Sequence, residues 1–272
     1  MWPFAMAIPM VKPSGPKGDS AEYREKKRLL ARMLTIYGRN PVLEALQDER
    51  IKVFRLHLAD SNKPNAMLSD MQRLAKQKGA EVLWHSKQAL SRISKNSQQD
   101  QGVALDVITE GFCHEDEWLT ALPEHFELMA VDGVTNPQNL GMIIRSLCAS
   151  PLAGLLLPEK GCAKLDALVI KASAGTLFRA PIIHTADLAA CLTRLKQQGC
   201  KVFGLDAEGS STIGSFQAPT RCVLVMGNES TGLSPQVKAL CDGFISIPMQ
   251  RGVESLNVSI AASLIAFRSL LN

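Results

Sequence analysis

The sequence predicts an α/β fold in two parts: a small α/β module, then a larger domain built on a parallel sheet. From residue 127 onward, short apolar segments alternate with helical patterns, as in parallel sheets that helices cover on both faces. Hydrophobic residues make up 46% of the 272 residues and charged residues 21%, which is enough apolar material for real cores. This length accommodates two domains of ordinary size.

We divide the chain into a basic leader (1–33), a first folded unit (34–110), a linker (111–126) and a second folded unit (127–272). The net charge is +4, but it is unevenly placed. Between Lys12 and Arg39, eight basic residues stand against three acidic ones. Such an arm suits a polyanion such as RNA, and an equally ordinary alternative is a solvated, flexible leader.

In the first unit, helical and strand patterns alternate. We expect a charged helix at 22–34, helices at 40–47, 65–78 and 86–93, and strands at 51–58, 80–84 and 102–108. Asn40-Pro41 predicts a helix start, because Asn caps well and proline fits the first helical position. Gly79 predicts a helix end.

The linker at 111–126 breaks this pattern with several acidic residues and Pro123. In the second unit we expect strands at 128–131, 154–157, 182–184, 201–205, 222–226 and 244–247, and helices at 140–149, 165–174, 186–198, 235–240 and 256–271. In parallel sheets of this kind, ligands bind at the carboxyl ends of the strands.

Several kinds of protein are disfavoured. The seven cysteines form no C-x-x-C pair, so we expect reduced thiols in the cytoplasm and no zinc site, and the five scattered histidines give no metal ligand spacing. The apolar first ten residues lack a basic start and contain two prolines, which is not typical of a signal peptide. No apolar run reaches the ~18 residues of a membrane helix.

Polar loops follow three of the predicted strands. The first, 132–141, leads into a helix with Asn139 as its predicted cap and Arg145 among apolar neighbours. Arg145 is either a surface charge or the partner of a phosphate. The second loop, 226–234, sets Glu229 between two glycines, which indicates a tight backbone approached by a ligand, or a plain turn.

The third loop, 247–259, joins the last strand to the last helix and contains Ser255 and Asn257. Ser255 is predicted to stand at the helix start, either as a cap alone or as part of a ligand site formed with unpaired backbone N–H groups. None of the three loops has the glycine pattern of a dinucleotide site or a P-loop, and no catalytic triad is evident. Spacing alone therefore predicts an α/β enzyme with a ligand site at strand ends.

Together the three loops resemble the motifs of the SpoU, or TrmH, family of RNA 2′-O-ribose methyltransferases in the SPOUT superfamily. The motifs are Asn136-Pro137-Gln138-Asn139-Leu140-Gly141 with Arg145; Gly227-Asn228-Glu229 with Gly232-Leu233; and Ile247-Pro248-Met249 with Ser255-Leu256-Asn257-Val258-Ser259. The stretch 37–41 and the stretch 101–104 resemble the RNA-binding domain of the RlmB-like branch.

The resemblance implies a domain with a trefoil knot that binds S-adenosylmethionine and no metal. The implied cofactor residues are Leu205, Met226, Gly227, Ile247, Met249 and Leu256. It also implies a homodimer through the C-terminal domain, where the small residues Ser259, Ala262, Ser263 and Ala266 would allow close packing.

For catalysis the resemblance implies Asn139, Arg145, Glu229, Ser255 and Asn257. Arginine is protonated at any ordinary pH, so we interpret Arg145 as a phosphate-aided activator that stabilises the developing alkoxide of the ribose. The chain departs from the family where Ser230 replaces glycine and where Ser146 and Leu147 replace threonine and alanine. Ser230 is expected to narrow the cofactor loop.

The implied function is S-adenosylmethionine-dependent 2′-O-ribose methylation of 23S ribosomal RNA. One alternative is the same reaction on transfer RNA, and the N-terminal module favours ribosomal RNA. Another is an inactive RNA-binding factor of ribosome assembly, which only Ser230 supports. A nicotinamide dehydrogenase is poorly supported because the glycine fingerprint is missing.

Overall fold

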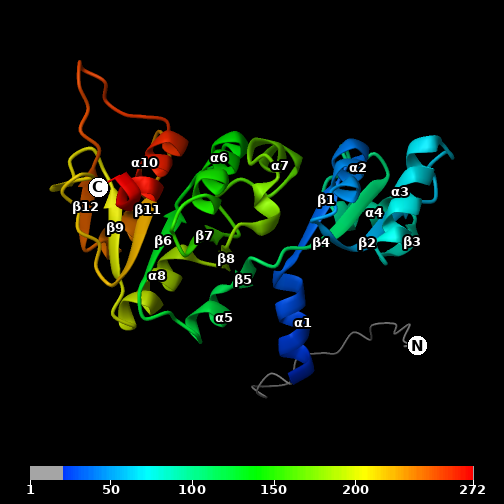
Figure 1. Ribbon diagram of the computed structural model, residues 1–272, viewed down its shortest axis with the longest axis horizontal. Helices are drawn as coiled ribbons and strands as arrows, with labels where there is room; N and C mark the ends of the chain where they lie inside the picture. Colours follow the sequence, from blue (N-terminus) through cyan, green and yellow to red (C-terminus); the bar gives the residue numbers. More distant parts are fainter. Residues whose placement is uncertain (1–20, 272) are drawn as a thin grey trace.

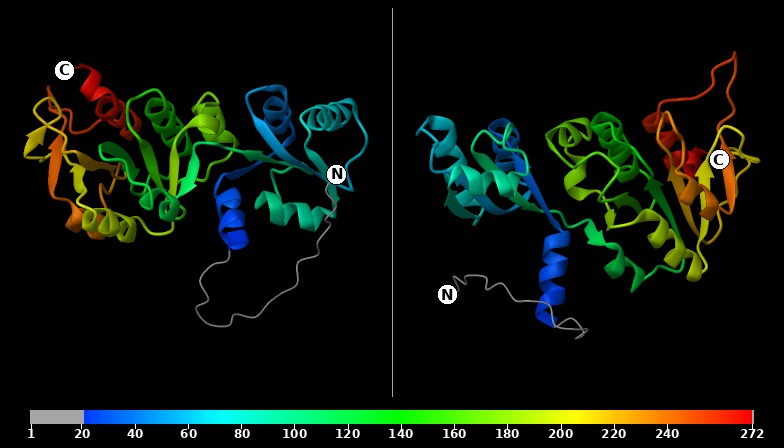
Figure 2. Two further views of the ribbon diagram at one scale, coloured as in Figure 1. Left: turned by 60° about the horizontal axis from the view of Figure 1, so that its bottom comes forward. Right: turned by 180° about the vertical axis from the view of Figure 1, so that it is seen from behind.

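The computed structural model describes residues 21–271, so most of the predicted basic leader lies outside the described residues. Two bodies lie side by side (Figures 1 and 2), and helix α1 (Ala21–Ala31) extends from the place where they meet. No described helix is long and apolar enough to cross a membrane.

The smaller body is a four-stranded sheet with helices. Its strands β1 (Met33–Tyr37), β2 (Lys52–Ala59), β3 (Glu81–His85) and β4 (Val103–Ile108) are ordered β1-β4-β2-β3. β4 is antiparallel to both neighbours, while β2 and β3 are parallel. The helices are α2 (Arg39–Gln47), α3 (Ala66–Gln77) and α4 (Lys87–Ser94).

Two predictions for this body are wrong in detail. The predicted helix at 22–34 ends at Ala31, and Met33 already begins β1, where pairing with β4 overrides the local preference. Asn40 does not cap α2. The cap position is Gly38, whose φ of 91° suits glycine, and Arg39 begins the helix.

The larger body is an eight-stranded, wholly parallel sheet. Its strands are β5 (Phe112–His114), β6 (Phe126–Val131), β7 (Gly154–Pro158), β8 (Ile182–Thr185), β9 (Lys201–Leu205), β10 (Ser211–Thr212), β11 (Arg221–Met226) and β12 (Gly243–Ser246). They are ordered β10-β12-β9-β11-β6-β7-β8-β5, and every pairing is parallel. The parallel α/β prediction is confirmed.

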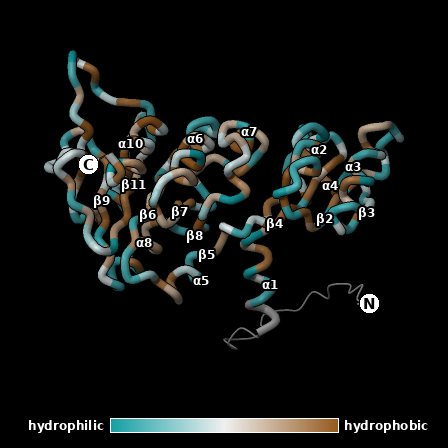
Figure 3. The backbone as a smooth tube through the Cα atoms, in the orientation of Figure 1, coloured by the Kyte–Doolittle hydropathy of each residue, from teal (hydrophilic) through white to brown (hydrophobic). Residues whose placement is uncertain are grey.

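Helices cover both faces of this sheet. They are α5 (Glu115–Leu119), α6 (Pro137–Cys148), α7 (Ala167–Ala172), the short 3-10 helix η1 (Thr176–Arg179), α8 (Leu188–Gln197), α9 (Pro235–Leu240) and α10 (Val258–Leu271). Residues of α6, α7 and α10 pack on one face, and residues of α5, α8 and α9 pack on the other. Within β6, Leu128 and Met129 are both fully buried but join opposite cores, which explains why the strands are apolar throughout. In Figure 3, β11 and α10 are largely brown, the colour of hydrophobic residues.

The stretch predicted as a linker is ordered and belongs to the larger sheet. β5 pairs in parallel with β8, and α5 follows it directly. Gly111, which immediately precedes β5, lies against Ala180. A Cβ added to Gly111 would meet the Ala180 carbonyl oxygen at 2.4 Å. A strand of three residues is too short for periodicity to detect, and its pairing with β8 and the burial of Phe112 hold it in the larger sheet.

The two bodies are tied together where α1 ends. The carbonyl oxygen of Arg32 accepts hydrogen bonds from the backbone N–H and the hydroxyl of Thr109, each at 2.8 Å. The Arg32 guanidinium reaches Glu117 of α5 at 3.1 Å. Segments from both bodies therefore meet at one junction.

Candidate functional site

A cavity of about 420 Å³ lies at the carboxyl ends of β9, β11 and β12. Its walls include all six residues predicted for the cofactor: Leu205, Met226, Gly227, Ile247, Met249 and Leu256. They come from three segments that are distant in the sequence. The cavity lies at the edge of the sheet where parallel α/β folds bind ligands.

Other walls of the cavity were not predicted from the sequence. Asp206, Thr212, Asn228 and Glu254 add polar groups, and Val258 and Ala261 add apolar surface from the first turns of α10. A hydrogen bond from the backbone N–H of Glu208, together with Lys238, lowers the pKa of Asp206, so this carboxylate is charged beside the cavity. Asn228 and Val258 stand within the motif stretches, although neither was named as a site residue. Thr212 reaches the wall because β10 pairs in parallel with β12.

The second predicted loop is a tight turn that presents Glu229. The backbones of Asn228 and Gly232 exchange two hydrogen bonds of 2.9 Å, and the Asn228 side chain donates to the Gly133 carbonyl at 2.7 Å. At Gly227 an added Cβ would lie 2.5 Å from the carbonyl carbon of Gly232, so only glycine fits. The loop therefore holds the cavity wall and the exposed carboxylate of Glu229 in one fixed arrangement.

Three of the predicted catalytic side chains form one hydrogen-bonded chain. The Asn257 amide donates to the side-chain oxygen of Asn139 at 3.1 Å, and the Asn139 amide donates to Glu229. Asn139 is only 6% exposed, while Asn257 and Glu229 are exposed. A buried asparagine thus connects all three predicted loops beside the cavity.

The helix starts differ from those predicted. α6 begins at Pro137, and its cap is Asn136, whose side chain accepts from the backbone N–H groups of Gln138 and Asn139. Asn139 is therefore not a cap, and its side chain is free to bond Glu229. The Asn-Pro pair at 136–137 is the same start signal that fails at 40–41, and here it is correct.

Ser255 does not begin the last helix. α10 starts at Val258, and Asn257 accepts hydrogen bonds from the backbone N–H of Ser259 at 2.9 Å and from its hydroxyl at 2.6 Å. Ser255 lies exposed in the loop between β12 and α10, where it lines the cavity. This loop is the orange segment that extends beyond the sheet in Figure 1.

Arg145 does not join the other predicted catalytic residues. It is exposed on α6, outside the cavity wall, and its side chain makes no hydrogen bond or ion pair with any residue that the structure describes. Six positions separate it from Asn139, which corresponds to about 9 Å along the helix axis. Its guanidinium is free to bind an anion from outside.

The departures from the family motifs lie outside the cavity. Ser230 is exposed, and its backbone N–H donates to the Asn228 side chain at 2.9 Å. Its side chain is not part of the cavity wall, so the expected narrowing is absent. Ser146 contacts Ser263 of α10 through their hydroxyls at 2.7 Å, and Leu147 is buried in the core.

The small residues of α10 pack within the chain. Ser259, Ala262 and Ala266 are at most 3% exposed, and α10 lies against α6. They are therefore not the free face that we expected for a dimer. The exposed apolar side chains nearby are Ile260 and Leu264 of α10 and Met142 of α6, at 51%, 36% and 41% exposure.

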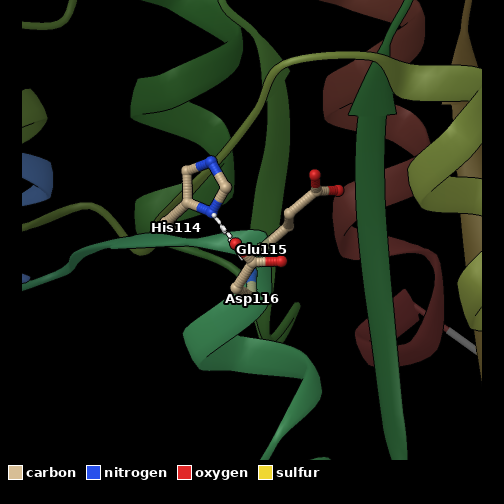
Figure 4. Close-up of side chains that lie close together, drawn as sticks. All are labelled: His114, Glu115 and Asp116. Carbon is tan, nitrogen blue, oxygen red and sulfur yellow. Dashed lines mark hydrogen bonds and ion pairs between the residues drawn. The ribbon is translucent and has the colours of Figure 1, made fainter. Parts of the chain in front are cut away.

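His114, Glu115 and Asp116 bring three side chains with metal-binding atoms together (Figure 4). The buried Glu115 carboxylate already accepts from Thr185 at 2.9 Å and lies 3.6 Å from the Arg194 guanidinium. Arg194 also pairs with Asp116 at 2.9 Å, and His114 Nδ1 accepts from the Asp116 backbone. These contacts make the cluster an ion-paired cap for α5.

Two family models match this chain. The substrate-binding model of RNA 2′-O ribose methyltransferases matches residues 35–110, and the SpoU rRNA methylase model matches residues 127–267, more than half of the chain. The chain belongs to the SpoU rRNA methylase family. The three loops and the cavity all lie within residues 127–267, the range of the SpoU methylase match.

Proteins similar in sequence to this chain are named as RNA methyltransferases. An uncharacterized tRNA/rRNA methyltransferase of Mycolicibacterium vanbaalenii is 34% identical over 235 residues, covering 85% of this chain and 74% of the relative. One of Mycobacterium avium is 33% identical over 256 residues, covering 93% and 82%. Both relatives are named as methyltransferases of tRNA or rRNA.

Solved structures share the fold. The SpoU methyltransferase AviRb of Streptomyces viridochromogenes, in complex with the cofactor AdoMet, superposes with a TM-score of 0.62 at 22% identity, covering 93% of each chain. An AdoMet-bound rRNA methyltransferase of Sinorhizobium meliloti gives 0.60 at 21% identity, covering 92% of this chain and 90% of that one. At this identity the comparison concerns the fold alone.

Proposed function

We propose that this SpoU family protein transfers a methyl group from S-adenosylmethionine to a ribose 2′-hydroxyl of 23S ribosomal RNA. The observation that carries the proposal is the cavity of about 420 Å³ beside the hydrogen-bonded chain Asn257–Asn139–Glu229. Residues 34–110 would bind the RNA and residues 127–272 would hold the cofactor and the reacting hydroxyl. Residues 111–126, which contribute β5 and α5 to the larger body, would join the two parts.

The cavity suits S-adenosylmethionine in size and in lining. Its volume is within the ~300–1,000 Å³ of small-molecule sites. Leu205, Met226 and Leu256 offer apolar surface to an adenine ring, and the backbone groups around Gly227 and Ile247 lie in the wall for hydrogen bonding. Two solved relatives of the same fold are bound to AdoMet.

The hydrogen-bonded chain Asn257–Asn139–Glu229 can position the ribose. When bound, the cofactor supplies an electrophilic methyl group. The exposed Glu229 and Asn257 can hold ribose hydroxyls, while the buried Asn139 keeps both side chains in fixed orientations. The exposed hydroxyl of Ser255 adds one more hydrogen-bonding group at the cavity wall.

Arg145 would act through the RNA phosphate. Because the guanidinium has no partner among the described side chains, it is available to bind a phosphate next to the reacting ribose. Its positive charge then stabilises the oxyanion that forms as the hydroxyl loses its proton. Because the arginine is always protonated, the proton would pass to the exposed carboxylate of Glu229.

We propose that two copies pair through α6 and α10. Met142, Ile260 and Leu264 form an exposed apolar patch, and burying it would stabilise a dimer. The test compares the sedimentation of the parent chain with that of a double variant, Ile260→Glu with Leu264→Glu. A parent chain that sediments as a monomer would refute the proposed dimer. The trefoil knot and the cytoplasmic location stay predictions from the sequence.

The test of the function is methyl transfer from labelled S-adenosylmethionine to purified 23S ribosomal RNA and, separately, to transfer RNA. We expect label in the ribosomal RNA that resists alkaline hydrolysis on the 3′ side of the modified nucleotide. Label only in transfer RNA would change the substrate and keep the chemistry. If calorimetry detects no binding of the cofactor, the protein is instead an RNA-binding factor. Ser230 does not support that alternative, because its side chain lies outside the cavity wall.

In the same assay, Arg145→Ala should abolish transfer and leave the cofactor's Kd unchanged, because Arg145 lies outside the cavity wall. Lys171→Ala, at an exposed cation on α7, is the matched control and should keep full activity. Full activity of Arg145→Ala would remove this residue from the mechanism.

A further inference from the structure

A second cavity, of about 590 Å³, lies between the two bodies, and the proposed reaction does not use it. One wall comes from β1 and the end of α4, with Thr35, Tyr37, Lys95 and Asn96. The opposite wall follows β7 and β8, with residues 157–159 and 163–166 and His184. The cavity therefore exists only because the smaller body lies against this part of the larger sheet.

Its lining suits a planar, hydrogen-bonding ring. His184 packs edge-to-face on the buried Phe112, with ring centroids 5.2 Å apart, and no described residue bonds its ring nitrogens. Tyr37, whose hydroxyl accepts from Asn96 at 3.1 Å, supplies a second aromatic ring on the other wall. Aromatic rings with a few polar groups are how proteins bind unstacked RNA bases.

The charged groups fit a nucleotide as well. Lys95 and Lys164 come from opposite walls, both are exposed, and neither pairs with a described carboxylate, so both can bind phosphate. Asp166, also in the wall, accepts from two backbone N–H groups at the start of α7. The exposed Glu159 can accept hydrogen bonds from exocyclic amino groups of a base.

The interdomain cavity lies along the same edge of the sheet as the proposed active site, because β11 of the first cavity pairs in parallel with β6. β6, β7 and β8 are neighbours in a parallel sheet, so their carboxyl ends meet along one edge. The backbone N–H of Ala163 donates to the Val134 carbonyl at 2.8 Å, joining the cavity wall to the loop that leads into α6. At Gly141 of α6, an added Cβ would lie 2.5 Å from the Ala172 Cβ of α7, so the two helices are in close contact.

We propose that this interdomain cavity binds a second nucleotide of the RNA strand, with its base between Tyr37 and His184 and its phosphate at Lys95 and Lys164. The inference rests on the proposed function, because it takes the strand at the active site to continue along the sheet edge. Both bodies would then hold the substrate at once, and recognition of the base here would contribute to the choice of the target sequence.

The first experiment maps where RNA touches the full chain. A single-stranded oligoribonucleotide of mixed sequence that contains 4-thiouridine is crosslinked by light, and the labelled peptides are identified by mass spectrometry. We expect crosslinks in peptides with Tyr37 and His184 in addition to those around the first cavity. Crosslinks confined to the loops around Glu229 and Ser255 would overturn the inference and leave the proposed function intact.

The second experiment measures binding of the same oligoribonucleotide by fluorescence anisotropy. His184→Phe keeps the packing on Phe112 but removes the ring nitrogens, and Lys164→Ala removes one cation. We expect each to weaken binding by about fivefold to tenfold, the scale of one lost base or phosphate contact. His125→Phe and Lys160→Ala are matched controls, since both positions are exposed and outside the cavity wall, and they should bind as the parent does.

Calorimetric binding of S-adenosylmethionine, measured on every variant, reports whether the larger body is folded. Unchanged cofactor binding with weakened RNA binding supports the inference, whereas parent-like RNA binding by both variants overturns it. If the parent chain binds the probe in this cavity but transfers no methyl group to any RNA, the proposed function fails and the inferred site remains.

Discussion

The side-chain amide of Asn257 donates a 3.1 Å hydrogen bond to the side-chain oxygen of Asn139, across 118 positions of sequence. Asn139 in turn donates to Glu229, 90 positions away. Because Asn139 is buried, it holds two exposed groups in place without meeting bulk solvent itself. The geometry of the candidate site therefore depends on this one amide.

Replacing Asn139 by alanine should reduce methyl transfer by about 10²-fold, because the groups that orient the ribose lose their common partner. It should also lower the free energy of unfolding by about 1–3 kcal/mol, since polar atoms of its neighbours lose their hydrogen bonds. Transfer of labelled methyl groups and urea unfolding measure the two effects. Gln138→Ala, at an exposed neighbouring position, serves as the control; equal losses in both variants would assign the effect to general damage of α6.

Gly227→Ala should weaken binding of S-adenosylmethionine and destabilise the larger body. The new Cβ would lie 2.5 Å from the carbonyl carbon of Gly232, so the backbone must shift, at a cost of about 1–3 kcal/mol. Calorimetry and thermal unfolding are the measurements. Gly214→Ala has no atom within 4 Å of the added carbon and should behave as the parent chain does. Parent-like cofactor binding in Gly227→Ala would mean that the loop is not part of the cofactor site.

Stability should fall as the pH is lowered from about 7.5 to about 5.5, partly through His184. Burial lowers the pKa of His184 below its ordinary 6.5, and the nearby His114 acts in the same direction, while Glu159 opposes both. The unfolded chain therefore takes up a proton near pH 6.5 that the folded chain still excludes, and this stabilisation of the folded state is lost as the pH falls towards the folded pKa.

The melting temperature of His184→Phe, followed over the same pH range, measures this contribution. We expect the melting temperature of the variant to fall less steeply than that of the parent chain, because a phenylalanine side chain cannot be protonated. His125→Phe, at an exposed position, should show the slope of the parent. Identical slopes in all three proteins would mean that His184 does not contribute to the pH dependence.

Cys200 and Cys222 should resist alkylation by iodoacetamide at neutral pH. Burial raises the pKa of each thiol to about 12, so almost no thiolate exists to react. Peptide mapping should find both unlabelled in the native chain and labelled after unfolding in urea. All seven cysteines are unpaired in the structure, so labelling under urea should need no reducing agent. Fast native labelling of either residue would contradict its burial.

Sequence pattern alone determined the α/β class, the parallel sheet and the three polar loops, because these depend on short-range alternation of apolar and polar residues. The family resemblance also selected six of the residues that line the first cavity. The sequence pattern missed β1, β5 and β10, since each depends on pairing with a strand distant in the chain. It began α10 two residues early because Leu256 fits the apolar pattern of the helix.

Only the tertiary structure decided which side chains meet. It joined Asn139 to Glu229 and Asn257, left Arg145 outside the cavity wall, and buried the small residues of α10 against α6. It also formed the interdomain cavity from Tyr37 and His184, residues that no motif connects. The reason is physical: local periodicity fixes which face of an element is apolar, whereas strand order and helix packing bring distant segments together.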